Sequence, residues 1–363
     1  MKLSDFDYHL PQNMIAQKPA APRDSSRLMV LDENEWRHHT FTDLPRFLRS
    51  GDLLVLNDSR VIPARLYGTR DTGGRVELLL VKRLDDAYYE CLVRGKVKTG
   101  TNLNFNTLSA TVKERIDTHT GYRYNIRFQC DGDFASHLYH EGVMPVPPYI
   151  KEQLEDSERY QTIYSRDEGS IAAPTAGLHF TPELIDTIKR MGVRLAFATL
   201  HVGVGTFMPV RAEKVEEHTM ESEYFTIDED TARTINDTLE VGGRIIVVGT
   251  TTVRALESAQ WLDGRIAPSR GWSEIFIHPP YQFKTPLSGL ITNFHLPGST
   301  LLMLISAYAG RDAVLAAYSE AIDKGYRFYS FGDAMFILDT GKGEYRTKTE
   351  NNVETAGYGR EWR

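Results

Sequence analysis

The sequence predicts an α/β protein: a layered domain with a mixed, largely parallel sheet, accompanied by a small antiparallel sheet or barrel. Three observations carry this prediction. Helical and strand-like stretches alternate after residue 155, short runs separated by Gly, Asp or Asn fill residues 67–129, and a proline-rich stretch follows at 144–150. Alternating helices and strands are typical of parallel sheets, whereas closely spaced short strands are typical of antiparallel barrels.

The first 150 residues contain one predicted strand of the layered domain and the whole strand-rich region. Gly51–Asn57 is a turn followed by a continuous apolar run, which predicts a buried strand. In the strand-rich region, runs such as 75–81 and 122–128 are separated by turn residues, and helical periodicity first appears at 133–141. The prolines of Met144–Ile150 fix an extended path and predict a rigid return link.

Capping signals and apolar patterns predict the remaining elements. Thr181, Pro182 and Glu183 mark the start of a helix that ends at Gly192. Further strands are predicted at 193–200, 244–249, 274–277 and 327–338, and further helices at 229–241, 253–262, 300–310 and 312–324. We expect residues 339–363, which are charged and rich in Gly, Thr and Asn, to be disordered.

Composition and charge exclude several classes of protein. The chain has 363 residues, 41% of them hydrophobic, which is enough for a large core, and its net charge of −7 argues against binding nucleic acid over the whole surface, though not against a local basic groove. Cys91 and Cys130 lie far apart, so neither a disulfide framework nor an iron–sulfur site is expected. The polar first residues and the lack of an apolar run of about 20 residues predict a cytoplasmic protein without membrane spans.

The clearest candidate for a ligand site is the turn from strand to helix at Gly249–Thr252. A buried strand leads into this turn, where backbone N–H groups and the helix dipole favour a polar ligand, and Thr251 lies within it. Arg254 and Glu257 are three residues apart and share one face of the following helix. An ordinary threonine cap with a surface ion pair explains the same pattern equally well.

His201 and two glycines follow another predicted strand. The segment resembles a dinucleotide-binding glycine loop but fails its pattern, because Met208 replaces the third glycine and no helix follows at once. Gly203 and Gly205 are therefore expected to let the backbone approach a ligand or another strand. His201 is a candidate acid or base, although a lone histidine is more often structural.

The segment Ala172–Phe180 is a loop of small residues that holds Thr175, Gly177 and His179. Small side chains permit close contact with a flat ligand. Tight packing of a turn is the alternative interpretation, and the loop alone favours it slightly.

The segment Thr292–Thr300 is polar although it lies between apolar runs, directly before a helix. Asn293 and His295 alternate there, so both can point to one side of a strand. A polar cluster within an apolar stretch favours a functional role for both residues.

The charged segments give weaker signals. His218–Tyr224 includes Glu223 but lacks metal-ligand spacing, so no metal site is expected. Arg60 and Arg65, just after the first strand, suit carboxylate or phosphate binding, or an anchor where the strand-rich region begins. The sequence has no GxxxxGK[ST] phosphate loop, which disfavours a nucleoside triphosphatase.

Taken together and in this order, these strings resemble one family. The similarity runs from about residue 3 to 338, through Asn57–Leu66, Met144–Ile150, Arg159–Ser165, Ala172–Phe180, Leu200–Val210, Val248–Ser258, Leu290–Gly310 and Tyr326–Ile337. Ala-Pro-Thr-Ala-Gly-Leu-His-Phe and Thr-Asn-Phe-His-Leu-Pro are long and unusual strings. The chain is similar to the S-adenosylmethionine:tRNA ribosyltransferase-isomerases of queuosine synthesis.

The resemblance implies a domain arrangement, a reaction and partners. It implies an α/β catalytic domain formed by 1–66 and 151–338, with 67–150 inserted as a β-barrel domain. The implied reaction converts tRNA bearing 7-aminomethyl-7-deazaguanine at the wobble position, plus S-adenosylmethionine, into epoxyqueuosine-tRNA, adenine and methionine. S-adenosylmethionine is a consumed co-substrate, so no cofactor and no metal are implied. The implied RNA partner is the tRNA anticodon stem-loop, and we expect a monomer without an obligate protein partner.

This reaction needs a base for the acidified ribose C5′ hydrogen, an acid for adenine and a water-poor pocket. His201 and His295 are the leading acid–base candidates, because neutral imidazole titrates near working pH. His179 is expected to act as an acid or to stack on adenine. Glu257 and Glu223 are the next acid–base candidates, and they are also expected to balance the sulfonium charge. The residues expected to bind substrate are Thr175, Gly177, Gly203, Gly205, Thr251, Arg254, Asn293, Arg60, Arg65 and Asp333.

The chain departs from the family pattern in three places. Glu221 stands where the family has a second histidine, Pro280 stands where glycine is usual, and Thr285–Gly289 differs from the usual lead-in to Thr-Asn-Phe-His.

Two rival functions remain open. An S-adenosylmethionine-dependent RNA methyltransferase would normally show a glycine-rich turn after its first strand, and none follows Leu53–Asn57. A non-catalytic RNA-binding module would stack bases on aromatic residues of the strand-rich region, such as Tyr88, Tyr89, Tyr122 and Tyr124.

Overall fold

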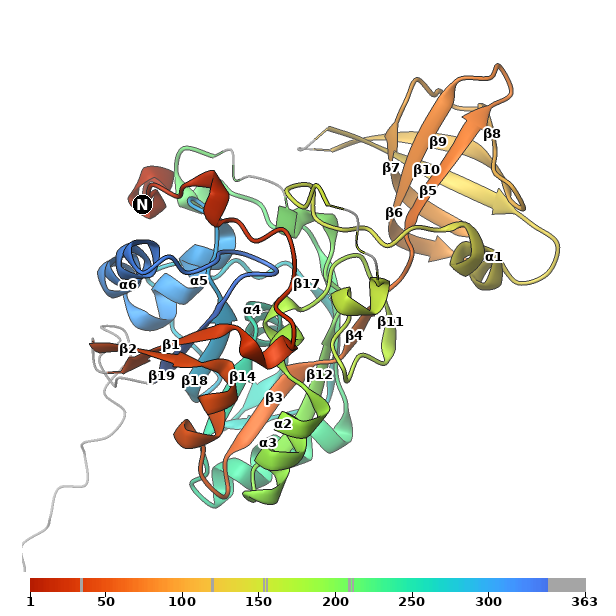
Figure 1. Cartoon of the computed structure of the whole chain (residues 1–363). Helices are drawn as coiled ribbons and strands as arrows, with labels where there is room; N and C mark the ends of the chain where they lie inside the picture. The colour runs from red at the N-terminus through yellow and green to blue at the C-terminus, as the bar shows by residue number, and fades with distance from the viewer. Residues whose placement is uncertain are drawn as a thin grey trace, which may run out of the picture.

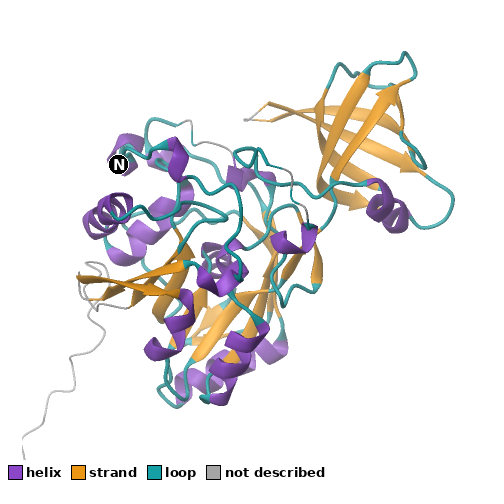
Figure 2. Ribbon diagram, in the orientation of Figure 1, coloured by secondary structure: helices purple, strands orange, loops and turns teal. Residues whose placement is uncertain are grey.

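A nine-stranded mixed sheet covered by helices and a closed antiparallel barrel make up the molecule, which confirms the predicted fold class (Figures 1 and 2). The computed structural model describes residues 1–338 except 33–34, 119–120, 153, 155, 208–209 and 211. The predicted disordered tail, 339–363, lies outside the described residues, as does Met208.

The order of the strands brings one set of strand ends to a single edge of the sheet. Across the sheet the order is β17 (Ser269–Ser273), β13 (Glu223–Ile227), β12 (Arg194–Leu200), β3 (Leu53–Asn57), β14 (Ile245–Val248), β18 (Leu287–Asn293), β19 (Ala334–Leu338), β1 (Arg27–Asp32) and β2 (Glu35–Thr40). The central strands β12, β3, β14 and β18 run parallel, so their carboxyl ends lie together. Since β19 is antiparallel to β18 and parallel to β1, the starts of β19 and β1 lie at the same edge.

Two hydrophobic cores cover the two faces of this sheet. In β3, Leu53 and Val55 contribute to one core and Leu54 and Leu56 to the other, as the alternation of side chains along a strand requires. The first core takes residues from α3 (Glu229–Glu240), α4 (Thr250–Ser258), α5 (Thr300–Ala309) and α6 (Arg311–Asp323). The second takes residues from α2 (Pro182–Arg190).

The barrel stands out from the layered body (Figure 1). Its closed order is β10 (Gly121–Gln129), β7 (Tyr88–Arg94), β6 (Arg75–Asp85), β5 (Arg65–Arg70), β8 (Asn102–Asn104) and β9 (Ser109–Thr118). Phe134 and Leu138 of α1 (Phe134–Glu141) are buried in its core. The side chains that alternate inward along each strand thus make a third core, independent of the sheet.

The chain enters and leaves the barrel beside a short parallel pair, β4 (Ser59–Val61) with β11 (Asp167–Ser170). On the return path, Met144, Val146, Tyr149 and Ile150 pack in a small cluster that includes Tyr160 and Phe331 of the layered body. The division into 1–66, 67–150 and 151–338 stays a prediction.

Two predicted strands are wrong in position. The strand expected at 274–277 lies earlier, at Ser269–Ser273, because that stretch pairs residue by residue with β13, whereas Ile275, Phe276 and Ile277 pack into the core as loop residues. The strand expected at 327–338 begins only at Ala334, because residues before it form a loop in which Tyr329 has a φ of 74°. The strands β1 and β2, inside the N-terminal segment, were not predicted individually.

Helix α4 also differs slightly from its prediction. It begins at Thr250, so the three threonines belong to its first turn, and it ends at Ser258 rather than 262. Trp261–Leu262 instead forms β15, paired with β16 at Arg265–Ile266.

Among the described residues, no single helix is long and apolar enough to cross a membrane; α5 and α6 reach that length and apolarity only as a pair bent by 115°.

Candidate active site

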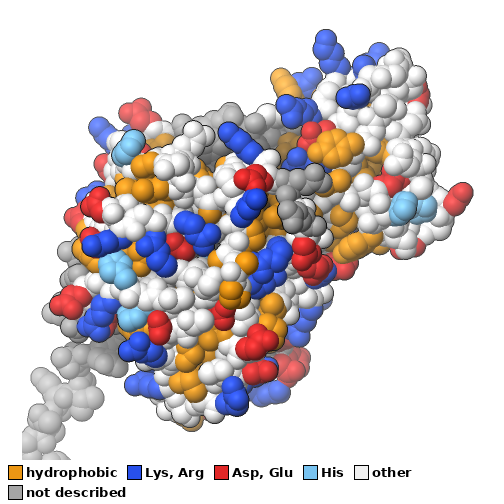
Figure 3. All heavy atoms as spheres, in the orientation of Figure 1, with side chains coloured by type: hydrophobic (Ala, Val, Ile, Leu, Met, Phe, Trp, Pro, Cys, Tyr) orange, Lys and Arg blue, Asp and Glu red, His pale blue; other side chains and the backbone are white. Residues whose placement is uncertain are grey.

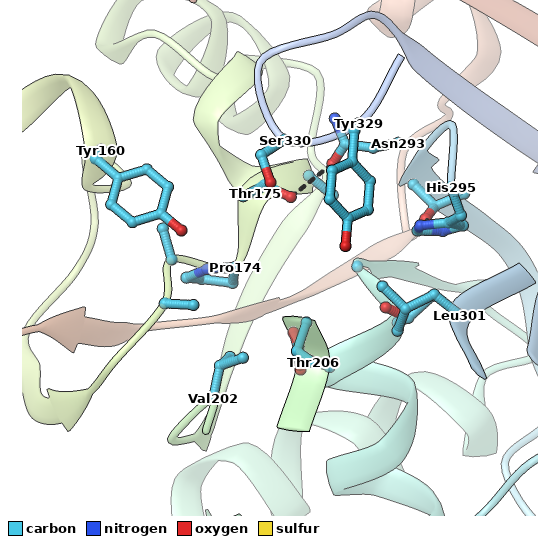
Figure 4. A pocket seen from close by; sticks show the side chains of 17 residues that line it. Tyr160, Pro174, Thr175, Val202, Thr206, Asn293, His295, Leu301, Tyr329 and Ser330 are labelled. Carbon is cyan, nitrogen blue, oxygen red and sulfur yellow. Dashed lines mark hydrogen bonds between the residues drawn. The ribbon is translucent and has the colours of Figure 1, made fainter. Parts of the chain in front are cut away.

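A cavity lies at the edge of the sheet where the central parallel strands end (Figure 4). It holds about 520 Å³ of empty space, including space open to solvent. Four of the predicted site residues line it together: Thr175, Thr251, Asn293 and His295. They come from the small-residue loop, from the start of α4 and from the end of β18, which are far apart in the sequence. Ligands of α/β sheets commonly bind at this edge.

A chain of hydrogen bonds fixes one wall of the cavity. The Thr175 hydroxyl donates to Asn293 Oδ1 at 2.9 Å, and Asn293 Nδ2 lies 3.1 Å from His179 Nε2. Because the amide nitrogen can only donate, Nε2 accepts and the proton of the neutral ring lies on Nδ1, 2.7 Å from Ser26 Oγ. The chain therefore sets the orientation of Asn293 and the tautomer of His179.

His179 supports this wall from behind and does not line the cavity. Its ring is buried and stacks on Phe41 with the centroids 5.0 Å apart. Burial lowers the pKa of His179 from 6.5 to about 4, so the ring is neutral at pH 7. The structure thus places His179 as a residue that positions Asn293.

His295 lines the cavity as a buried, neutral imidazole. Its Nε2 lies 2.9 Å from the Thr292 hydroxyl, and its backbone N–H donates to the Tyr318 hydroxyl at 2.8 Å. The Tyr8 hydroxyl donates to its carbonyl oxygen. Burial lowers the pKa of His295 from 6.5 to about 3. The ring therefore takes part in any chemistry from its uncharged form.

Thr251 is held in the cavity by Asn57, the last residue of β3. Asn57 Nδ2 donates to Thr251 Oγ1 at 3.2 Å and to the Leu200 carbonyl at 2.9 Å. Asn57 Oδ1 accepts from the backbone N–H groups of Ser59 and Leu200. One buried amide thus ties together the ends of β3 and β12 and the first turn of α4.

The cavity wall is uncharged. Its described lining residues include no Asp, Glu, Lys or Arg, and the only ionisable ring among the predicted residues there is the neutral His295. Hydroxyls of Thr175, Thr251 and Ser330 and the Asn293 amide supply the polar contacts. Such a wall fits a flat, polar but uncharged group such as a purine.

Three predicted residues form a charged cluster outside the cavity. Arg254 Nη1 forms a buried ion pair with Glu223 Oε2, and the backbone N–H of Gly203 donates to Glu223 Oε1 at 2.7 Å. Arg254 Nε and Nη2 have no hydrogen-bond partner among the described residues. The cluster adjoins the cavity through α4, where Thr251 lies one turn before Arg254.

His201 also lies outside the cavity, one residue before Val202, which lines it. His201 Nε2 is 3.3 Å from Asp167 Oδ1, and Nδ1 is buried with no partner among the described residues. Burial lowers the pKa of His201, while the nearby carboxylates of Asp167 and Asp58 oppose that shift. Its ring stacks on Tyr224 at 6.4 Å.

Glu257 is fully buried and does not line the cavity. Its carboxylate accepts hydrogen bonds from the Tyr281 hydroxyl at 3.0 Å and from the backbone N–H groups of Lys284 and Thr285 at 3.0 and 2.8 Å. All of these partners belong to one loop, so Glu257 anchors that loop to α4. The structure does not bring it to the cavity.

The remaining predicted residues surround the cavity or lie elsewhere. Asp333 accepts from the backbone N–H groups of Arg27 and Arg327 at 3.0 and 2.8 Å, and thereby fixes the loop that carries Tyr329 and Ser330. Gly177 packs so closely that an added Cβ would lie 2.1 Å from the Tyr164 hydroxyl. Gly205 lies against the side chain of Glu221.

The two predicted arginines lie away from the cavity. Arg60 pairs with Glu158 and donates to the Ser165 hydroxyl at 3.0 Å, beside a separate hollow next to the barrel. Arg65 pairs with Glu77 at 3.1 Å at the start of the barrel. These contacts lie at the junction between sheet and barrel, which fits the alternative interpretation of their sequence positions; substrate binding by either arginine stays a prediction.

Sequence reasoning did not single out the aromatic walls of the cavity. Tyr160 and Tyr329 line it from opposite sides, with Ser330 beside Tyr329 and Thr206 below (Figure 4). Both tyrosines lie in segments that carry the family resemblance. The signal for Tyr329 was weak because its segment is apolar and reads as a strand, whereas its positive φ belongs to a loop.

Among the described residues, no group of three or more His, Cys, Asp or Glu side chains is arranged to hold a metal ion.

Three comparisons with known proteins all match nearly the whole described chain. The family model described as queuosine biosynthesis protein matches residues 3–337. An S-adenosylmethionine:tRNA ribosyltransferase-isomerase of Pelotomaculum thermopropionicum is 52% identical over 343 residues, which cover 93% of this chain and 100% of that protein. The crystal structure of S-adenosylmethionine tRNA ribosyltransferase from Thermotoga maritima is 41% identical, with a TM-score of 0.54 and coverage of 92% of this chain and 100% of that one. The chain therefore belongs to the queuosine biosynthesis protein family.

Proposed function

We infer that the protein is an S-adenosylmethionine:tRNA ribosyltransferase-isomerase. It transfers and isomerises the ribosyl group of S-adenosylmethionine onto 7-aminomethyl-7-deazaguanine at the tRNA wobble position, and releases adenine and methionine. Family membership supports the reaction. The structural observation that carries it is the uncharged cavity at the carboxyl edge of the sheet, into which Thr175, Thr251, Asn293 and His295 converge.

An uncharged, partly enclosed cavity suits the first chemical step. The sulfonium acidifies the C5′ hydrogens of the ribose, and it does so most strongly where no carboxylate neutralises its charge. The described lining residues supply none. In a water-poor site this electrostatic effect is larger than in bulk solvent. Tyr160, Tyr329 and the Asn293 amide offer a flat and polar setting for adenine.

We propose that His295 moves the proton in this reaction. It is the one predicted acid–base residue that lines the cavity. A pKa near 3 corrects the expectation that this imidazole titrates near working pH. It makes His295 a weak base, which passes on a proton taken from C5′ and does not retain it. The departing adenine needs one proton, so transfer through His295 to adenine balances both steps.

The other predicted residues have supporting roles in this proposal. His179 positions Asn293, and the Arg254–Glu223 pair supports the segment that follows β12. His201, paired with Asp167, is a second proton-transfer group separated from the cavity by one residue. We also propose that the anticodon stem-loop is the part of tRNA recognised, that the enzyme works as a cytoplasmic monomer, and that 67–150 is the inserted domain.

Product analysis tests the function. The full-length protein is incubated with S-adenosylmethionine and an anticodon stem-loop that carries the deazaguanine amine. Free adenine and methionine in equal amounts are the expected products. S-adenosylhomocysteine would instead identify an RNA methyltransferase, and binding of the stem-loop without consumption of S-adenosylmethionine would identify a non-catalytic RNA-binding protein.

A further inference from the structure

A row of three rings crosses the outer strands of the sheet beside the cavity. Trp272 of β17 pairs directly with Tyr224 of β13, and the backbone N–H of His201, just after β12, donates to the Tyr224 carbonyl. The Trp272 and Tyr224 centroids are 5.4 Å apart, and those of Tyr224 and His201 are 6.4 Å apart with nearly parallel planes. We call Trp272, Tyr224 and His201 the aromatic row.

The outer end of the aromatic row is open to solvent and positively charged. Trp272 is 49% exposed, which is unusual for so large an apolar side chain. The ammonium of Lys82, from barrel strand β6, lies 4.2 Å from the centre of its ring. Arg270 lies two residues before Trp272 and is exposed on the same face of β17. The row thus begins with an accessible ring that has Lys82 against it and Arg270 on the same face of its strand.

The inner end of the aromatic row reaches the cavity wall. Val202 follows His201 directly, pairs with Ala172 in a β-bridge, and lines the cavity together with Ala172. The carboxylate of Asp167 lies at this end, paired with His201. A strand of RNA that leaves the cavity along the row therefore passes from the acidic end towards the cations.

We propose that the aromatic row binds an unpaired anticodon-loop nucleotide next to the one that enters the cavity. Its base stacks on Trp272, and Lys82 and Arg270 contact the flanking phosphates. Single-stranded RNA is commonly held by aromatic rings beside cations, because every base offers a π face. This inference rests on the proposed function in one respect, the identity of the RNA.

Charge on the rest of the molecule favours such a local site. The net charge is −7, and on the face shown in Figure 3 the Lys and Arg side chains are interspersed with Asp and Glu. That face therefore offers no broad basic surface for binding RNA. Stacking with a few phosphate contacts is then the main source of binding.

The barrel offers a matched alternative. Tyr122 of β10 is 56% exposed, and the guanidinium of Arg115 lies 3.5 Å from the centre of its ring. This unit resembles Trp272 with Lys82 but lies outside the aromatic row. It allows the two surfaces to be compared by equivalent substitutions.

The test measures the affinity of a fluorescein-labelled, unmodified anticodon stem-loop for the full-length protein by fluorescence anisotropy, without S-adenosylmethionine. Trp272→Ala is expected to weaken binding about tenfold, because a stacked base is lost. Trp272→Phe retains a ring and is expected to stay within about threefold of the unsubstituted protein. Tyr122→Ala is expected to leave the affinity unchanged.

Salt dependence separates stacking from phosphate contact. Arg270→Ala is expected to weaken binding and to reduce the slope of log affinity against log salt by about 1. Trp272→Ala is expected to leave that slope unchanged, since the lost contact is uncharged. Circular dichroism checks the fold of each variant; should Trp272→Ala be misfolded, the affinity and salt slope of Arg270→Ala decide the matter.

Unchanged affinity in both Trp272→Ala and Arg270→Ala would overturn the proposal. Loss of affinity in Tyr122→Ala alone would move the RNA to the barrel, and would overturn it too. Because binding is read without turnover, the result is independent of the reaction. A protein that binds through Trp272 but releases no adenine would refute the proposed function only. One that releases adenine, with unaltered binding in both Trp272→Ala and Arg270→Ala, would refute this inference only.

Discussion

The cavity and the neighbouring edge of the sheet, formed by β12, β13 and β17, differ in whether they contain charged side chains. The cavity has an uncharged described lining, and its polar groups are held by hydrogen bonds to one another, as in the chain from Thr175 through Asn293 to His179. The sheet edge carries the buried ion pair of Arg254 with Glu223, and the His201 ring lies against the carboxylate of Asp167. Val202, which lines the cavity and directly follows His201, lies where the two regions meet.

This difference indicates a division of roles. Neutral groups in a fixed network keep their protonation states, and the histidines there have a pKa of about 3 or 4 because they are buried. Charges that would quench a sulfonium are kept outside the cavity, where they stabilise the fold and the surface. Substitutions at the sheet edge should therefore affect stability and RNA binding, whereas substitutions in the cavity should affect chemistry.

The largest expected effect is on stability, at the sheet edge. Arg254→Ala removes the ion-pair partner of Glu223, whose side chain is only 2% exposed. The carboxylate then stays buried with the Gly203 N–H as its remaining contact, so the free energy of unfolding should fall by about 3–5 kcal/mol. Urea unfolding followed by circular dichroism measures this change.

A double substitution provides the control for that measurement. Arg254→Met combined with Glu223→Leu replaces the pair by apolar side chains, which is often close to neutral in free energy. The double variant should therefore be more stable than Arg254→Ala. A single variant as stable as the unsubstituted protein would show that solvent reaches Glu223.

The next effect concerns the pH dependence of stability and belongs to the cavity wall. The pKa of His295 falls from 6.5 to about 3 on folding, and that of His179 from 6.5 to about 4. Below pH 6.5 these two histidines bind protons in the unfolded chain but stay neutral in the folded chain. The free energy of unfolding therefore falls as the pH is lowered from 6.5 towards 4. The combined loss should be on the order of a few kcal/mol.

Urea unfolding at several pH values measures this loss, and His295→Gln isolates one share of it. Carboxylates titrate in the same window in both proteins, so the difference between their curves reports the histidine. The variant should lose less stability than the unsubstituted protein between pH 6.5 and 4. Parallel curves would mean that His295 is solvated in the folded protein.

The sequence was sufficient to predict polar residues at the strand ends, but not the aromatic residues that line the cavity. Thr251 and Asn293 were singled out because they are polar residues beside apolar runs, and parallel strands bring such positions to one edge. Thr175 was singled out only as the hydroxyl of a loop of small residues. Tyr329 was not, since its loop reads as a strand until its backbone is seen. The partner of a buried charge is a matter of tertiary packing: Glu257 anchors a loop, although its spacing from Arg254 suggested a shared role.

A smaller effect, now on activity, compares one histidine from each region. His295→Ala should lower kcat at least about tenfold, because the proton-transfer group in the cavity is lost. His201→Ala should also lower turnover at least about tenfold if its pair with Asp167 takes part in proton transfer. Adenine release under saturating substrates measures both rates.

His218→Ala serves as the control, because His218 is half-buried and belongs to neither group. Its kcat should match that of the unsubstituted protein. Near-normal kcat in His295→Ala and His201→Ala alike would reject the acid–base assignment. A lower kcat in His295→Ala alone would mean that proton transfer takes place only in the cavity. His201 would then act only as a member of the aromatic row.

The smallest expected effect lies where the sheet edge meets the barrel. Arg123 of β10 pairs with Glu90 of β7 at 2.6 Å and also with Glu221, the residue that stands in place of a histidine in the family pattern. Glu221→Gln leaves Arg123 one carboxylate, so the free energy of unfolding should fall by about 1 kcal/mol or less.

Thermal unfolding of Glu221→Gln, Arg123→Gln and the double variant measures the coupling between the two side chains. Additive effects would show that the Arg123–Glu221 pair does not hold the barrel to the sheet, and that Lys82 against Trp272 is then the contact to examine. A coupled result would mean that the Arg123–Glu221 pair holds the barrel to the sheet edge, so that high salt loosens the barrel there and leaves the uncharged cavity unaffected.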